Sequence, residues 1–171
     1  DNATPSTQEI CSGEASATVV LSSSVVGTGF EYTLVNTNIP NEISGFETNI
    51  SGTGDLPQMT LINGLAEPYI LYYEVVPSAE GCGGDPVSFS ITINPSPQVV
   101  FDQQDQVLCN NDSSAVVSLN STTSDVNFQW TRNTPVGLVG FETGDEQGDG
   151  IIPSFTLENT TNAPIDLVFT A

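Results

Sequence analysis

Apolar and polar residues alternate in several short runs of the chain, and turn-forming residues separate these runs. The clearest runs are residues 69–77 and residues 87–94; in the second, Val87, Phe89 and Ile91 alternate with serine and threonine. Successive side chains of a strand point to opposite faces, so this alternation predicts half-buried antiparallel strands. Similar but weaker runs predict further strands at residues 8–10, 17–23, 29–36 and 58–63. No convincing helical period appears.

The expected core positions follow from the same alternation. In residues 17–23 we expect Ala17, Val19 and Leu21 to share the buried face. Short strands separated by Gly, Pro and Asn turns predict an all-β fold, either a sandwich or a barrel. The aromatic positions Tyr32 and Trp130, each on an early strand, fit the core aromatic of an immunoglobulin-like β-sandwich.

The pattern occurs twice along the chain. The tetrapeptide Gly-Phe-Glu-Thr stands at residues 45–48 and again at 140–143, and the Ala-x-Val-x-Leu pattern of residues 17–21 returns at 115–119. A collinear set of matches at a nearly fixed offset indicates an internal repeat. The Pro-Ser-Pro at residues 95–97 restricts the backbone and marks the boundary. We therefore predict two tandem β-sandwich modules, residues 1–95 and 96–171.

The second module is expected to be incomplete at its C-terminus. Residues 85–94, which close the first repeat, have no counterpart in the second, and the offset of 96 places the counterpart of Cys82 near position 178. The sequence accordingly resembles a section of a longer protein, or one whose last strand comes from elsewhere. Open sheet edges recruit strands, so a filament subunit completed by strand donation is an alternative.

The three cysteines bear on this interpretation. With no histidine in the chain a zinc site is implausible, and a Cys11–Cys82 disulfide formed in an oxidising compartment is the expected arrangement. Cys109 alone could be a free thiol, a metal ligand or half of an intermolecular bridge. Because Cys109 stands where Cys11 stands in the first repeat, we expect it to pair with a cysteine outside this section.

The charge of the chain excludes several classes of partner. It has 21 acidic residues, one basic residue (Arg132) and a formal net charge of −20. One arginine cannot neutralise the phosphates of nucleic acid or attract an anionic membrane surface. No apolar run approaches the length of a membrane span, so direct membrane insertion is not expected. Such charge favours solubility and keeps copies of the chain apart.

Candidate catalytic and metal-binding residues are few. Without histidine or lysine, the Ser-His and Cys-His types of nucleophilic catalysis are excluded, and we do not expect an enzyme. Asp145, Glu146 and Asp149 are weak candidates for Ca²⁺ because they lie in a glycine-rich loop, and Asp102 and Asp105 lie near the boundary. Their spacing does not match an alternating calcium loop, so a solvated acidic loop and no cofactor are expected.

Two further positions allow alternative interpretations. Arg132 shares a strand face with Phe128 and Trp130 and could bind a ligand, although an arginine whose stem covers apolar surface and whose head pairs with a local acid is favoured. The repeated Phe46 and Phe141 could be exposed contact residues; we favour structural plugs of the core.

Several motifs of the first repeat resemble a known family. They are Ile-Cys-Ser-Gly at residues 10–13, Val-Gly-Thr-Gly-Phe at 26–30, Tyr-Tyr-Glu-Val-Val-Pro at 72–77 and Cys-Gly-Gly at 82–84. Together they resemble the PKD-like (polycystic kidney disease-like) repeats of giant surface proteins of flavobacteria and other Bacteroidota, including gliding-motility adhesins. The second repeat is a divergent copy, with Leu-Cys-Asn-Asn at 108–111 and an acidic loop at 144–150.

This resemblance implies immunoglobulin-like modules in long extracellular arrays that are exported by the type IX route and act in adhesion. We accordingly expect a non-catalytic spacer and display stalk at the cell surface. Its expected partners are adjoining repeats of the same chain and, beyond them, surface polysaccharide or other cell-surface proteins. A glycan- or calcium-binding module is a further alternative.

Overall fold

The computed structural model describes residues 1–46, 51–142 and 146–171. The chain divides into two compact units, Asp1–Ser96 (unit 1) and Pro97–Ala171 (unit 2). The boundary expected from the sequence lies one residue before this division. The described residues contain strands and no helix, so the predicted all-β fold class is confirmed.

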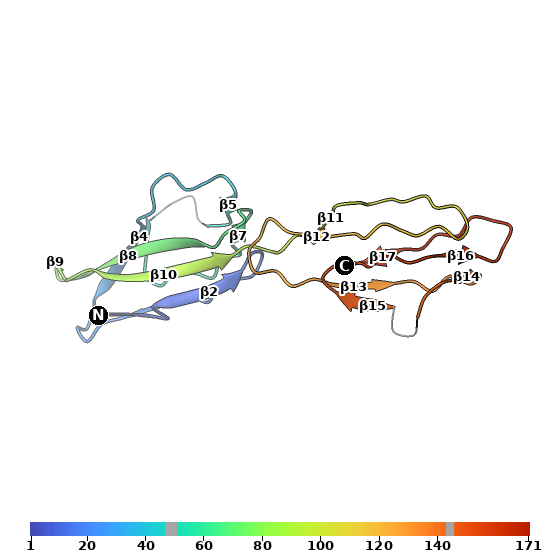
Figure 1. Ribbon diagram of the computed structural model, residues 1–171. Helices are drawn as coiled ribbons and strands as arrows, with labels where there is room; N and C mark the ends of the chain where they lie inside the picture. The colour runs from blue at the N-terminus through green and yellow to red at the C-terminus, as the bar shows by residue number, and fades with distance from the viewer. Residues whose placement is uncertain (47–50, 143–145) are drawn as a thin grey trace. The chain divides into compact units, whose positions relative to one another are not determined.

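Unit 1 has one large sheet, which Figure 1 shows as long neighbouring arrows. Its order is β2 (Thr7–Cys11), β10 (Val87–Asn94), β8 (Tyr69–Ala79), β4 (Gly29–Leu34) and β6 (Ser51–Thr53), with β9 (Cys82–Gly83) paired to the end of β8. Neighbouring strands are antiparallel except for β2 and β10, which run parallel. The sheet thus places the first and last long strands of the unit side by side.

A second, thinner layer faces this sheet. It contains the pairs β1 (Asn2–Thr4) with β3 (Val20–Ser22) and β5 (Ile43–Ser44) with β7 (Ile62–Asn63), joined by the bridges Ala15–Thr60 and Val19–Leu56. Between the layers lies one apolar cluster that includes Val19, Leu61, Leu71 and Ile91, all fully buried. Two such layers around one core make a β-sandwich.

The alternation predicted the buried face of the long strands correctly. Tyr32 and Leu34 of β4, and Phe89, Ile91 and Ile93 of β10, are all buried. On residues 17–23 the prediction was wrong at one position, because Ala17 is exposed and Ser16 is fully buried. The side-chain amide of Gln8, nine residues earlier in the chain, bonds both backbone groups of Ala17, and this contact takes Ala17 out of the strand pattern.

Unit 2 repeats this architecture with shorter strands. Its sheets are β11 (Val100–Phe101) with β12 (Leu119–Asn120), β15 (Gln147–Asp149) with β13 (Gln129–Arg132) and β17 (Phe169–Thr170), and β14 (Leu138–Val139) with β16 (Glu158–Asn159). The register matches that of unit 1: Trp130 opposes Gly148 as Tyr32 opposes Gly52. Trp130, Phe155 and Leu157 are among the buried residues of its core.

Polar contacts recur as well. The amide of Gln106 bonds both backbone groups of Ala115, as Gln8 does with Ala17. The amide of Asn133 bridges to the backbone of residues 166 and 168, as Asn36 bridges to residues 70 and 72. These side chains replace ladder bonds at the same points of both units, so the two units share one design down to individual hydrogen bonds.

One strand of that design has no counterpart in the described part of unit 2. In unit 1, β10 lies between β2 and β8. In unit 2 the counterpart of β8 is β17, which pairs only with β13, and residues 105–109, the counterpart of β2, are assigned to no strand.

Candidate functional site

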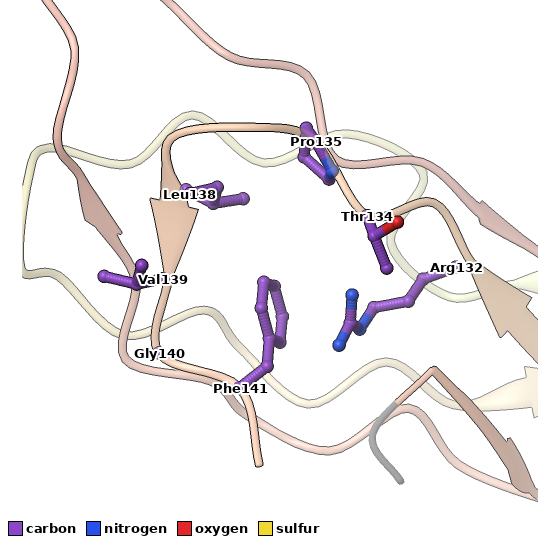
Figure 2. A pocket seen from close by; sticks show the side chains of 7 residues that line it. All are labelled: Arg132, Thr134, Pro135, Leu138, Val139, Gly140 and Phe141. Carbon is purple, nitrogen blue, oxygen red and sulfur yellow. The ribbon is translucent and has the colours of Figure 1, made fainter. Parts of the chain in front are cut away.

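The only arginine of the chain lies in a hollow of unit 2. Arg132, on β13, extends its guanidinium over the ring of Phe141, with its Cζ atom 3.6 Å from the ring centroid. Its Nη1 donates a hydrogen bond of 3.0 Å to the backbone oxygen of Asn133. Figure 2 shows this pair at the wall of a hollow of about 250 Å³, lined by Arg132, Thr134, Pro135, Leu138, Val139, Gly140 and Phe141.

The backbone at Gly140 brings Phe141 to this position. Gly140 has a φ of 114°, and a Cβ atom there would overlap the carbonyl oxygen of Thr156. Gly45 in unit 1 has a φ of 90° and the same close approach to Thr60. Only glycine fits such a contact at positive φ. The repeated Gly-Phe pair is therefore a structural device, and Phe46 and Phe141 both pack partly buried against their cores, as expected for plugs.

The hollow combines one cation, one aromatic ring and several apolar side chains. Arg132, which is half-buried, replaces the buried Leu34 of unit 1, and a solvent-accessible cation over an aromatic ring contributes about 0.5–1 kcal/mol. The lining residues include one hydroxyl, that of Thr134, and no carboxylate or thiol. They therefore offer no general base or activated nucleophile, which acid–base and covalent catalysis require.

The acidic candidates do not come together in the described residues. Glu146 and Asp149 are exposed near the two ends of β15, and Asp145 lies outside the described residues. The carboxylate of Asp102 accepts a 2.9 Å hydrogen bond from the backbone N–H of Ser118, so it supports the β11–β12 pair. The described part of the chain contains no cluster of three or more His, Cys, Asp or Glu side chains able to hold a metal ion.

The predicted Cys11–Cys82 disulfide is not formed, and the register explains why. Cys11 lies level with Asn94, at the last residue of β10, whereas Cys82 pairs with Ala79 at the far end of β8. Figure 1 shows β9 and the end of β2 at opposite ends of the sheet. At about 3.3 Å per residue they are roughly 30 Å apart. A disulfide needs Cα atoms within about 7 Å.

All three cysteines are free and exposed. The backbone N–H of Cys109 donates to the Asp112 carboxylate, as that of Cys11 donates to Glu14, so the two cysteines do occupy equivalent positions. The partner inferred for Cys109 near position 178 was derived from the Cys11–Cys82 pairing. Without that pairing the inference loses its basis.

Sequence reasoning missed several side chains that organise both units. Gln8 and Gln106 recur at an offset of 98, and Asn63 and Asn159 recur at 96. The apolar matches between the two repeats have the same offsets. The recurrence of these polar residues could therefore have identified them from the sequence. The contact between Arg132 and Phe141 had no such signal, because unit 1 has Leu34 in place of the arginine.

No helix in the described residues is long and apolar enough to cross a membrane. No curated protein matches the chain. A family model described as PKD-like domain matches residues 8–97, which is just over half of the sequence and nearly all of unit 1.

Proposed function

Because the chain belongs to the PKD-like domain family, we propose that it is a non-catalytic structural section of an extracellular protein, which spaces and displays other parts of that protein. Domains of this family are typically extracellular and generally not enzymes. Function must still be argued from the features of the individual structure, since one fold supports many functions. Here the supporting feature is mechanical.

The observation that carries the proposal is the pairing of β2 with β10 in unit 1. The two strands run parallel over five residue pairs, from Thr7–Ser90 to Cys11–Asn94. The chain enters β2 at one end of this pair and leaves β10 at the other. A pull along the chain therefore slides the strands past each other. Because such a pull runs along the strands and across the bonds that join them, it loads these bonds together rather than one after another.

Additional bonds lengthen this connection. Ser90 donates from its N–H to the carbonyl of Ser6, and Ser12 donates to Asn94 at 2.8 Å. The side-chain amide of Asn94 also donates to the Glu9 carboxylate at 2.8 Å. The contact that resists the pull thus extends past both ends of β2, which suits a module held under tension.

Single-molecule pulling of the full chain tests this proposal. The N–H of Ser12 points to β10, and alternate backbone groups of a strand point to the same side, so the N–H of Ile10 also faces β10 and that of Thr7 faces away. Ile10→Pro removes a donor from the loaded ladder and should lower the unfolding force of unit 1. Thr7→Pro, the matched control, should leave that force nearly unchanged. Equal unfolding forces for Ile10→Pro and the unmodified chain would show that the β2–β10 pair does not resist the pull.

The proposal also includes the biological setting of the chain. The motifs of the first repeat support, by resemblance, a long cell-surface protein of Bacteroidota that is exported by the type IX route and acts in adhesion or gliding. Antibodies to this chain should then label intact cells, and the mature polypeptide should be many times heavier than the 18.0 kDa of this section. A mature mass near 18 kDa would contradict the long-array assignment.

The partners proposed for such an array are its own adjoining repeats and, less directly, surface polysaccharide or other surface proteins. A glycan array probed with the full chain, with and without EDTA, separates a spacer from a glycan- or calcium-binding module. A spacer gives no glycan signal above background under either condition. A signal abolished by EDTA would favour the calcium-binding alternative.

A further inference from the structure

The segment that surrounds the hollow of unit 2 is shorter than its counterpart in unit 1. Phe46 follows Leu34 by twelve positions, whereas Phe141 follows Arg132 by nine. In unit 1 the longer segment includes Ile39, which packs half-buried against the core. The hollow of unit 2 therefore lies in a region that unit 1 fills with an apolar side chain.

The turn that follows shows where the shortening lies. The N–H of Leu138 donates to the carbonyl of Pro135, as the N–H of Ile43 donates to that of Pro40. This turn is the same in both units, so the missing residues precede the proline, where unit 2 has only residues 133 and 134, both exposed. Leu138 is half-buried, whereas its counterpart Ile43 is buried, so the hollow leaves apolar surface open to a ligand.

The hollow places the only basic side chain of the chain beside this apolar surface. The guanidinium of Arg132 lies over the ring of Phe141 and donates to the carbonyl of Asn133. Figure 2 shows it at one side of the hollow, with Leu138 and Val139 at the other. A guanidinium has five N–H donors in a planar fork that matches a carboxylate, so it can hold a ligand together with groups of the protein. A ligand that reaches both sides thus combines a carboxylate with an aliphatic body.

The lining residues disfavour other classes of ligand. Their side chains offer one hydroxyl, that of Thr134, so most hydroxyls of a sugar would lose their bonds to water without replacement. They offer no carboxylate for a cation. The net charge of −20 repels polyanions strongly and a ligand with a single negative charge least.

The volume of the hollow limits the ligand to about the size of one amino-acid residue. It is about 250 Å³, which is below the roughly 300–1,000 Å³ of sites for drug-sized ligands. A cavity of about 150 Å³ holds benzene, so this hollow accepts a group somewhat larger than that. A branched aliphatic side chain together with its carboxylate has this size.

We propose that the hollow of unit 2 binds a terminal carboxylate on a branched aliphatic body, either the C-terminal residue of a polypeptide or a free acid of that size. The carboxylate accepts hydrogen bonds from the guanidinium of Arg132, and the aliphatic part lies against Leu138 and Pro135. All lining residues belong to unit 2, so this site is independent of the mechanical role proposed for the β2–β10 pair of unit 1.

Titration of the full chain with N-acetyl-leucine, followed by nuclear magnetic resonance, tests the proposal. Arg132 is the only arginine, so its Nε–H signal is unambiguous and reports directly on the site. We expect this signal to shift and to saturate at one ligand per chain, at roughly millimolar concentration for so small a ligand. N-acetyl-leucine amide lacks the charge and N-acetylglycine lacks the aliphatic body, and each should bind roughly tenfold more weakly.

Two variants test the position of the ligand, with the backbone amide signals of residues 138–141 as the readout. Arg132→Leu introduces the residue that unit 1 has at this position, Leu34, so unit 2 should fold and binding should be lost. Val136→Ser is the matched control, since this side chain is 95% exposed and does not line the hollow. It should bind as the unmodified chain does, and equal binding by the two variants would overturn the proposal.

Two further results also overturn it. One is an Nε–H signal that N-acetyl-leucine does not move. The other is a shift that sodium chloride of equal ionic strength reproduces, since the ligand would then only screen Arg132 from surrounding charges.

The peptide acetyl-Gly-Ser-Gly-Leu distinguishes the two sources of the carboxylate. Binding at least as tight as that of N-acetyl-leucine supports the C-terminus of a polypeptide. Weaker binding of the peptide supports a free acid.

Discussion

The side-chain amide of Asn63 donates a hydrogen bond of 2.7 Å to the backbone oxygen of Ile93. This bond ties the thin layer of unit 1 to β10 in the large sheet. The same amide also donates to the carbonyl of Glu67, and its oxygen accepts from the N–H of Leu65. Asn159 of unit 2 makes the equivalent turn contacts, to the carbonyl of Ala163 and the N–H of Thr161. The difference between the two asparagines is the additional bond of Asn63 to β10.

Asn63→Ala should destabilise unit 1 by about 2–3 kcal/mol, because it removes three hydrogen bonds and leaves buried backbone groups without a partner. Circular dichroism in urea follows the β-structure of both units, whereas Trp130 fluorescence follows unit 2 alone. The variant should shift the transition seen by circular dichroism and leave the fluorescence transition in place. Asn159→Ala, at a more exposed site, should cost less; an equal loss would argue against the interlayer role of Asn63.

Gly140→Ala should destabilise unit 2 by roughly 3 kcal/mol or more, since the new methyl group overlaps the Thr156 carbonyl at a strained positive φ. Gly150 is the matched control: its φ is 71° and no atom lies within 4 Å of an added Cβ. Gly150→Ala should cost only the backbone strain, about 1–2 kcal/mol. Trp130 fluorescence in urea measures both, and similar losses would show that the Thr156 contact does not matter.

Three thiols per chain should react with a thiol reagent in the absence of denaturant and reductant, because all three cysteines are free and exposed. Cys82→Ser should change the free energy of unfolding by less than about 0.5 kcal/mol, as for other surface substitutions. Loss of a native disulfide would cost about 2–5 kcal/mol. If only one thiol per chain reacts and Cys82→Ser loses about that much stability, a disulfide between Cys11 and Cys82 is present after all.

Unit 1 should lose stability above pH 10 through Tyr73. Burial, and secondarily the neighbouring Tyr32, raises the pKa of Tyr73 from 10.0 to about 12. The unfolded chain therefore releases this proton first, so the contribution is fully present below pH 10 and is lost as the pH rises towards 12. The total is about 3 kcal/mol at about 1.4 kcal/mol per pKa unit. Urea unfolding at pH 9 and pH 11 should show the loss, and Tyr73→Phe should reduce it; an unchanged pH dependence in the variant would assign the loss to other groups.

The sequence allowed much of each unit to be predicted. Alternation identified the buried face of β10 through Phe89 and Ile91, and the recurring motifs identified two copies of one design. The prediction failed at Ala17, where a side-chain amide nine residues away holds the backbone. It also failed for Cys11 and Cys82, because two cysteines of one small β domain need not lie close together, and the strand register keeps these two apart.

What the sequence determined by itself is local: strand periodicity, turn positions and the offset between repeats all lie in neighbouring residues or in the comparison of one stretch with another. What only the tertiary structure decided is which distant residues become neighbours. The parallel register of β2 with β10 separates Cys11 from Cys82 by the length of the sheet. Strand pairing joins segments some eighty residues apart, and it depends on packing between layers that no local pattern records.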